Sequence, residues 1–187
     1  AKGGASAYQT DGFGRILKET NRLGFFQSFA YRLDGSLSAL QDYEGKKTAC
    51  SYDRAENKVT VSYADGSYSE EIRDAAGNIL SARNDSSHLR FTYDTAGHML
   101  TQQDVLTGQS LRCTYDDCGR RVRLQSEKQD VTYRYGKRGE LTEVSDRMSG
   151  LGMKFVYDDM GREILRLHST GESQQSVYDE AGRLLLT

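Results

Sequence analysis

Apolar and polar residues alternate over short stretches of the chain, and these stretches recur about every 21 residues. The most regular apolar positions are Leu17, Val59, Leu80, Leu100, Val122, Ile164 and Leu185. A second set of apolar residues lies two positions further along each repeat: Leu40, Val61, Ala82, Leu124 and Val144. A period of two over a short run indicates a half-buried strand and not a helix. The pattern therefore predicts many short antiparallel strands and no helix longer than one turn.

A six-residue motif of the form Y-D-x-x-G-R precedes these stretches. Its nine copies begin at Thr10, Tyr31, Tyr52, Arg73, Tyr93, Tyr115, Tyr135, Tyr157 and Tyr178. The first position is Tyr in seven of the nine copies, the second is Asp in seven and the fifth is Gly in eight. The motif residues singled out on this basis are Tyr31, Tyr52, Asp53, Tyr93, Asp94, Gly97, Tyr115, Asp116, Gly119, Arg120, Tyr135, Gly139, Tyr157, Asp158, Gly161, Arg162, Tyr178, Asp179, Gly182 and Arg183. Because the period is nearly constant, we interpret residues 1–187 as a single array of about nine repeats.

The motif has the chemistry of a hairpin turn. An Asp at the head of a turn accepts a hydrogen bond from an amide two residues on, and a Gly supplies the positive φ that a type I turn with a bulge requires. Where Glu56 replaces the Gly, Asn57 follows and can adopt the left-handed conformation. A second, looser turn is expected to close each repeat. Nine such units predict an all-β fold, with roughly 16–18 strands in one long, curved or spiralling antiparallel sheet.

The composition agrees with this fold and excludes several classes of protein. The chain has no Pro, 12 Tyr and 19 Gly, which suits hydrogen-bonded strands joined by tight turns. A net charge of −2 argues against a nucleic-acid partner, which would require a basic excess. No apolar run reaches the ~20 residues of a membrane span. The chain begins Ala-Lys-Gly-Gly, without a signal peptide, and we expect it to be a fragment of a larger protein.

The nine motif copies, clearest at residues 178–184, resemble the YD-repeat or Rhs-repeat family. That family includes bacterial Rhs polymorphic toxins, shell components of insecticidal toxin complexes and the animal teneurins. The resemblance covers nearly the whole chain and implies a secreted or cell-surface β-sheet shell, which in bacterial members encloses a C-terminal toxin domain. The chain departs from bacterial shells in lacking the Pro-containing segment associated with self-cleavage, so no autoprotease residue is assigned.

The sequence thus predicts a non-enzymatic structural segment in the wall of a YD/Rhs-repeat β-shell that encapsulates a toxin or effector domain for secretion and delivery. Its expected partners are the remainder of the same shell and the enclosed domain. The alternative hypothesis is a cell-surface module that binds a glycan or a protein through the face of the sheet. No catalytic, metal-binding or cofactor-binding residue is assigned.

Three kinds of candidate chemistry were weighed against structural roles. The motif carboxylates resemble repeated calcium ligands, but one Asp per turn is better explained as a turn cap, because calcium needs several converging oxygens. Cys113 and Cys118 have a zinc-like spacing, yet two further ligands are missing. His88, His98 and His168 accompany no nucleophile motif.

The tyrosine row and one basic cluster have two interpretations each. One Tyr in each repeat on one face would form either a platform for a sugar or peptide, or a ladder of packed rings, and we favour packing. The basic residues Arg120, Arg121 and Arg123 are offset by nearby carboxylates, which favours a solvated ion-pair surface.

Overall fold

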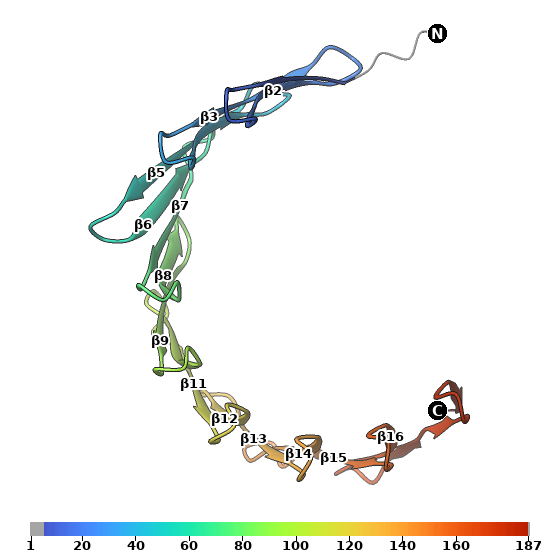
Figure 1. Cartoon of the computed structure of the whole chain (residues 1–187). Helices are drawn as coiled ribbons and strands as arrows, with labels where there is room; N and C mark the ends of the chain where they lie inside the picture. The colour runs from blue at the N-terminus through green and yellow to red at the C-terminus, as the bar shows by residue number, and fades with distance from the viewer. Residues whose placement is uncertain (1–5, 187) are drawn as a thin grey trace. The chain divides into compact units, whose positions relative to one another are not determined.

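The computed structural model describes residues 6–186, which form 19 strands and no helix (Figure 1). Strands β1 to β17 belong to one 17-stranded sheet, and β18 and β19 form a separate two-stranded sheet. Consecutive strands pair antiparallel as hairpins. The predicted all-β sheet of hairpin repeats is therefore confirmed. Since none of the described residues is helical, no helix among them could cross a membrane.

The chain divides into two units, residues 1–90 and 91–187. The strands of the first unit are β1 (Ala7–Thr10), β2 (Ile16–Thr20), β3 (Phe26–Tyr31), β4 (Leu37–Gln41), β5 (Lys47–Asp53), β6 (Lys58–Ser62), β7 (Tyr68–Arg73) and β8 (Ile79–Asn84), and β9 (His88–Tyr93) begins in it. The strands of the second unit are β10 (Met99–Asp104), β11 (Ser110–Tyr115), β12 (Arg121–Gln125), β13 (Asp130–Tyr135), β14 (Leu141–Asp146), β15 (Gly152–Tyr157), β16 (Glu163–His168), β17 (Ser173–Gln175), β18 (Val177–Tyr178) and β19 (Leu184–Leu186).

The motif turn between β11 and β12 shows how the sequence sets the hairpin. The Asp116 amide donates to the Arg120 carbonyl over 2.9 Å, and the Gly119 amide donates to the Asp116 carbonyl over 2.9 Å. Gly119 has φ +76°, and the pairing register shifts by one residue between Thr114 and Tyr115. This is the expected turn with a bulge, in which the left-handed residue is a glycine because it has no Cβ.

The turn between β5 and β6 takes a different form, because Glu56 stands in the place of the motif glycine. Asn57 adopts the left-handed conformation with φ +49°, as the sequence predicted. The register continues without a shift, so that Tyr52 pairs with Val59 and Asp53 with Lys58. An asparagine one position later therefore closes the hairpin without a bulge.

Most second turns are no looser than the motif turns, and in this respect the prediction is wrong. The turns at 21–25, 42–46, 63–67 and 168–172 have the same pair of backbone hydrogen bonds as the motif turn. Those at 84–87 and 126–129 are tighter. Within residues 6–186, the longer second turns are those at 104–109 and 146–151. The reason is local, since Asn21 and Asp42 cap their turns as the motif Asp does, accepting amide hydrogen bonds of 2.9 Å from residues two positions on.

The continuous meander ends at β17. Ser176 separates β17 from β18, and its amide donates to the Ile164 carbonyl over 3.0 Å. The last motif turn, at 179–183, therefore lies in the small β18–β19 sheet and not in the main one.

The sheet has one apolar face, and nothing among the described residues covers it. The cross-strand pairs on this face are Phe29 with Leu40, Cys50 with Val61, Cys113 with Leu124 and Tyr133 with Val144. The other face carries polar alternate pairs such as Thr114 with Arg123 and Thr132 with Ser145, although Val156 pairs with Leu165 there. Cys113, which is 6% exposed, is the only buried residue in the described part of the chain. We call the first of these surfaces the apolar face.

Candidate functional site

The motif residues come together between neighbouring repeats. In the clearest case, Asp116 Oδ1 accepts hydrogen bonds from the amides of Cys118 (3.0 Å) and Arg120 (2.9 Å), and Oδ2 accepts one from Arg120 Nε (2.8 Å). The Arg120 guanidinium lies 4.8 Å from the centre of the Tyr135 ring in the next copy. The Tyr135 hydroxyl donates to the Arg121 carbonyl over 2.9 Å. We call this Asp–Arg–Tyr connection a rung.

Rungs of the same kind recur in both units. Arg15 lies 4.8 Å from the centre of the Tyr31 ring, and Arg162 lies 4.9 Å from that of Tyr178. The Tyr178 hydroxyl donates to the Glu163 carbonyl over 3.0 Å, which repeats the contact of Tyr135. A cation above an aromatic ring at an exposed site contributes about 0.5–1 kcal/mol. The motif is therefore a joint between successive repeats as well as a turn.

One rung uses histidine where the others use arginine. The His98 ring stacks on Tyr115, with the ring centres 4.9 Å apart and the planes at 25°. His98 Nδ1 lies 2.9 Å from Asp94 Oδ2, and the Tyr115 hydroxyl donates to the Met99 carbonyl over 2.9 Å. A Cβ on Gly119 would lie 2.7 Å from His98 Nε2. Gly119 is thus needed for its backbone conformation and also for the space that His98 occupies.

The copy at Tyr135 reverses the roles of two motif positions. Gly136 stands where seven copies have Asp, and Glu140 stands where four copies have Arg. Glu140 Oε2 accepts the Arg138 amide over 3.0 Å, which is the hydrogen bond that the motif Asp makes elsewhere. A Cβ on Gly136 would collide with the Glu140 carboxyl group. The Arg138 guanidinium in turn reaches the Asp159 carbonyl of the next copy over 2.7 Å.

Two copies in the first unit also depart from the motif. In the copy at Tyr31, Asp34 caps the turn through the Ser36 amide (3.0 Å), while Arg32 lies 5.2 Å from the Tyr52 ring centre. In the copy at Arg73, which lacks the Tyr, the Asn57 side-chain amide donates to the Arg73 carbonyl over 3.0 Å. Successive turns therefore stay joined where the consensus residues are missing.

Hydrogen bonds within the turns lower the pKa of three motif carboxylates. The hydrogen bond from the Arg120 side chain lowers the pKa of Asp116, and the hydrogen bond from the His98 side chain lowers that of Asp94. For Asp158, the backbone amide of Arg162 is the main cause of the lowered pKa. Each of these carboxylates accepts hydrogen bonds from its own turn.

The other candidate residues lie apart from one another. Within residues 6–186, no three His, Cys, Asp or Glu side chains are grouped to hold a metal ion. Cys113 is buried on the apolar face, whereas Cys118 is exposed in a turn. His88 Nε2 lies 3.2 Å from Ser81 Oγ, at the start of β9, whereas His98 lies in the turn that follows this strand.

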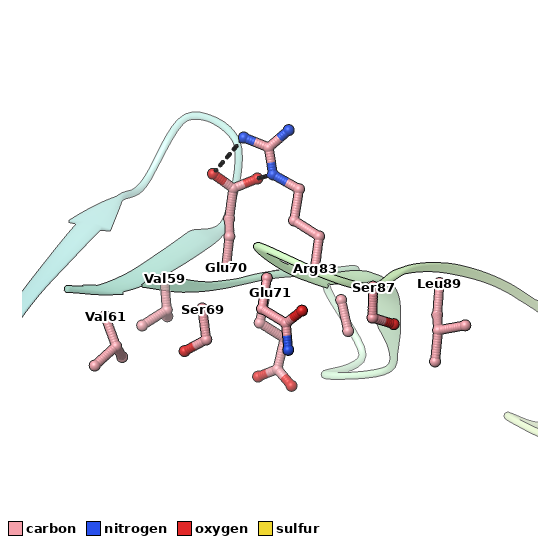
Figure 2. A pocket seen from close by; sticks show the side chains of 10 residues that line it. Val59, Val61, Ser69, Glu70, Glu71, Arg83, Ser87 and Leu89 are labelled. Carbon is pink, nitrogen blue, oxygen red and sulfur yellow. Dashed lines mark hydrogen bonds and ion pairs between the residues drawn. The ribbon is translucent and has the colours of Figure 1, made fainter. Parts of the chain in front are cut away.

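A hollow that the sequence did not predict lies on the apolar face of the first unit. It measures about 380 Å³ and lies over β6 to β9 (Figure 2). Val59, Val61, Ser69 and Leu89 project into it on the same side of the sheet as Glu71, while Glu70 and Arg83 project from the opposite side. A sequence signal existed, because Glu71 stands two residues before the first motif position, where seven of the other eight copies carry Tyr8, Phe29, Cys50, Phe91, Cys113, Tyr133 and Phe155.

Comparison with solved structures identifies the same fold in a toxin complex. The crystal structure of TcdB2-TccC3 without its hypervariable C-terminal region matches with a TM-score of 0.60 and 15% identity, over 98% of this chain and 13% of that one. The TcdB2-TccC3-Cdc42 structure matches with a TM-score of 0.57 and 15% identity, over 98% and 13%. The TcdB2-TccC3-TEV structure matches with a TM-score of 0.57 and 12% identity, over 97% of this chain and 15% of that one.

The chain therefore spans 13–15% of the length of these solved chains. At such low identity the likeness is one of fold. No protein-family model matches the sequence, and a search of curated proteins gave no match.

Proposed function

We propose that this chain is a non-enzymatic segment of the wall of a YD/Rhs-repeat β-shell, with its apolar face turned toward an enclosed toxin or effector domain. The observation that carries the proposal is a single sheet layer whose repeats are joined turn to turn while one face stays apolar. A globular domain would bury that face against a second layer. In a shell, the enclosed polypeptide and the rest of the wall take that place.

The structural neighbours support this proposal at the level of fold. The TcdB2-TccC3 structures contain the same arrangement of strands over nearly all of this chain. The motif adds a second line of support, because the sequence resembles YD-repeat shells independently of the coordinates. The same resemblance leads us to propose that the protein acts outside the cell, secreted or at the cell surface.

A structural role also suits the chemistry of the rungs. Catalytic histidines need a nearby nucleophile or substrate pocket. The His98 ring instead stacks on Tyr115, and its Nδ1 shares a hydrogen bond with Asp94. Both contacts belong to the joint between two repeats.

The proposal is tested by photo-cross-linking from the two faces of one strand. Leu124 and Arg123 are neighbours in β12, and Leu124 pairs with Cys113 on the apolar face while Arg123 pairs with Thr114 on the other. A benzophenone amino acid is placed at either position in the intact polypeptide that contains this chain, and cross-linked peptides are identified by mass spectrometry. We expect position 124 to capture an enclosed domain and position 123 to capture none of it.

Equal capture from both positions, or capture only of separate surface proteins from position 124, would overturn the shell proposal. Circular dichroism of both labelled proteins serves as the control for folding.

The second candidate function, glycan binding, is supported only by tyrosines outside the rungs. The motif tyrosines of the rungs have a guanidinium or imidazole over one ring face, which leaves them poor stacking platforms. Tyr8, Tyr43 and Tyr63, by contrast, are 57%, 37% and 44% exposed. A glycan array with the intact chain, compared with the Tyr8→Ala and Tyr43→Ala variants, tests this candidate. Binding that depends on these residues would support it, and no binding would exclude it for the glycans on the array.

A further inference from the structure

The hollow on the apolar face lies where the row of large residues is interrupted. In four other hairpins, an aromatic residue or a cysteine pairs with an aliphatic one across the strands: Phe29 with Leu40, Cys50 with Val61, Cys113 with Leu124 and Tyr133 with Val144. In the β7–β8 hairpin the corresponding pair is Glu71 with Ala82. The pair next to it is Ser69 with Asn84, so the centre of the hollow is formed by short or polar side chains.

Three larger apolar side chains line the hollow beside its polar residues. Val59 is paired with Glu71, Val61 with Ser69, and Leu89 with Ala82. Figure 2 shows Val59, Val61 and Leu89 projecting on the same side of the sheet, with Glu71 between the valines and the leucine. A flat apolar group placed among these three side chains would remove their apolar surface from water, which is favourable.

Only one of the two carboxylate oxygens of Glu71 accepts hydrogen bonds from the described residues. Glu71 Oε2 accepts hydrogen bonds from Arg73 Nε (3.0 Å) and Nη2 (2.7 Å). Oε1 accepts none from the residues that the structure describes. Because Arg73 already balances the charge of Glu71, the free oxygen favours a neutral hydroxyl donor over an ammonium group.

We propose that this hollow binds a tyrosine side chain of a polypeptide partner. The ring lies among Val59, Val61 and Leu89, and the phenol hydroxyl donates to Glu71 Oε1. The inference rests on the proposed function only in placing a polypeptide against the apolar face; the recognition itself follows from the shape and the hydrogen-bonding groups of the hollow.

The test is a titration of the whole 187-residue chain followed by methyl NMR. The probe is N-acetyl-L-tyrosinamide, and the reporters are the methyl groups of Val59, Val61 and Leu89. We expect saturable shifts at these methyls. N-acetyl-L-phenylalaninamide should bind about tenfold more weakly, because it lacks the hydroxyl that bonds the carboxylate. N-acetyl-L-lysinamide should bind more weakly than the tyrosine probe as well.

Two variants separate the hydrogen bond from the shape of the hollow. Glu71→Gln replaces a charged acceptor with a neutral one and should weaken tyrosinamide binding about fivefold while leaving the phenylalanine probe unchanged. Its matched control is Glu70→Gln, which alters the adjacent carboxylate on the opposite side of the sheet, where Glu70 pairs with Arg83. Ala82→Leu fills the hollow and should abolish binding of both probes. The exposed Ala49→Leu, on the opposite face of β5, is its control.

Three results would overturn the proposal. They are the absence of saturable shifts in the native chain, equal shifts at distant apolar-face methyls such as those of Leu124 and Val144, and binding that Ala82→Leu leaves unchanged. Equal affinity for the lysine probe would also overturn it, since a neutral donor is then not preferred. The cross-linking from Leu124 does not involve the hollow, so its outcome and that of the titration are distinguishable. Loss of probe binding with capture of an enclosed domain intact rejects the tyrosine site alone.

Discussion

Two motif glycines illustrate that the same residue type is required for different reasons. Gly161 has φ +80°, and a Cβ built there would meet no heavy atom within 4 Å. The requirement at Gly161 is thus one of backbone conformation alone. Gly119 has a similar φ, +76°, but its missing Cβ also leaves room for the His98 ring. Substitutions at these two positions therefore test different interactions.

Gly161→Val is expected to destabilise the β15–β16 hairpin by about 1–2 kcal/mol or more, because a left-handed conformation is costly for a residue with a Cβ and more so for a β-branched one. Urea denaturation and amide hydrogen exchange in β15 and β16 measure the effect. Gly12→Val is the matched control, because Gly12 lies in a motif turn, has ample space around it and does not have a positive φ. Equal losses in the two variants would contradict the turn geometry.

At the same scale, the sequence predicted the conformation of single residues better than their partners. The positive φ of Gly161 and of Asn57 follows from local turn chemistry, which a few consecutive residues determine. The role of Glu140 was missed, because a carboxylate at the sixth position becomes a turn cap only when Gly136 leaves space for it. Such a compensation depends on side-chain geometry across the turn, which the spacing of residues does not reveal.

The hairpins are joined to one another by the rungs, and this coupling is the main property of the repeat as an element. A rung contains the Asp and Arg of one copy and the Tyr of the next. Two hairpins joined in this way should not respond independently to changes at their joint, whereas changes within separate joints should add.

A double-mutant cycle of Arg162→Ala and Tyr178→Leu should give a coupling energy of about 0.5–1 kcal/mol, the range for a cation above an exposed aromatic ring. Denaturation of the single and double variants provides the measurement. The control cycle combines Arg162→Ala with Tyr115→Leu, whose hydroxyl bonds the Met99 carbonyl in a separate joint. It should be additive. Equal coupling in both cycles would show that the rung is not the unit of connection.

The sequence predicted the strands and the motif turns, but it did not predict the rungs or most second turns. Strands follow from alternation over five or six residues, which is local information. The second turns were expected to be loose because they lack the motif, although Asn21 and Asp42 supply the same cap. Arg162 and Tyr178 are far apart along the chain, and only the antiparallel register brings the guanidinium over the ring. The apolar row was predicted, and its interruption at Glu71 can be read from the aligned motif copies, but the resulting hollow between Val59 and Leu89 became visible only when the strands were paired.

The whole chain exposes much more surface than a globular protein of its mass. Its accessible area is 13193 Å², whereas about 9,000 Å² is expected for a folded monomer of 21.0 kDa. Within the described residues, only Cys113 is buried. Stability must therefore accumulate from each hairpin and its contacts with the adjacent ones, as in other repeat proteins. A weak interaction that recurs in many copies then has a large summed effect.

The recurring motif carboxylates make acid sensitivity a property of the entire array. The pKa values of Asp116, Asp158 and Asp179 lie below the ordinary value of 3.8 in the folded chain, mainly through hydrogen bonds from Arg120, Arg162 and Arg183. The unfolded chain therefore binds more protons in acid. The stability from these groups is present above that ordinary value and is lost as the pH falls through the lower, folded values.

We accordingly expect the melting temperature, followed by circular dichroism, to fall steadily as the pH is lowered from about 4 to about 2. The triple variant with Asn at positions 116, 158 and 179 is the control, because Asn21 shows that an amide caps this turn equally well. Its melting temperature should be lower near neutral pH, where the ion pairs are missing, and should fall less in acid. An unchanged melting temperature across this range, or the same decline in the triple variant, would show that the carboxylates of the rungs contribute no stability that depends on their charge.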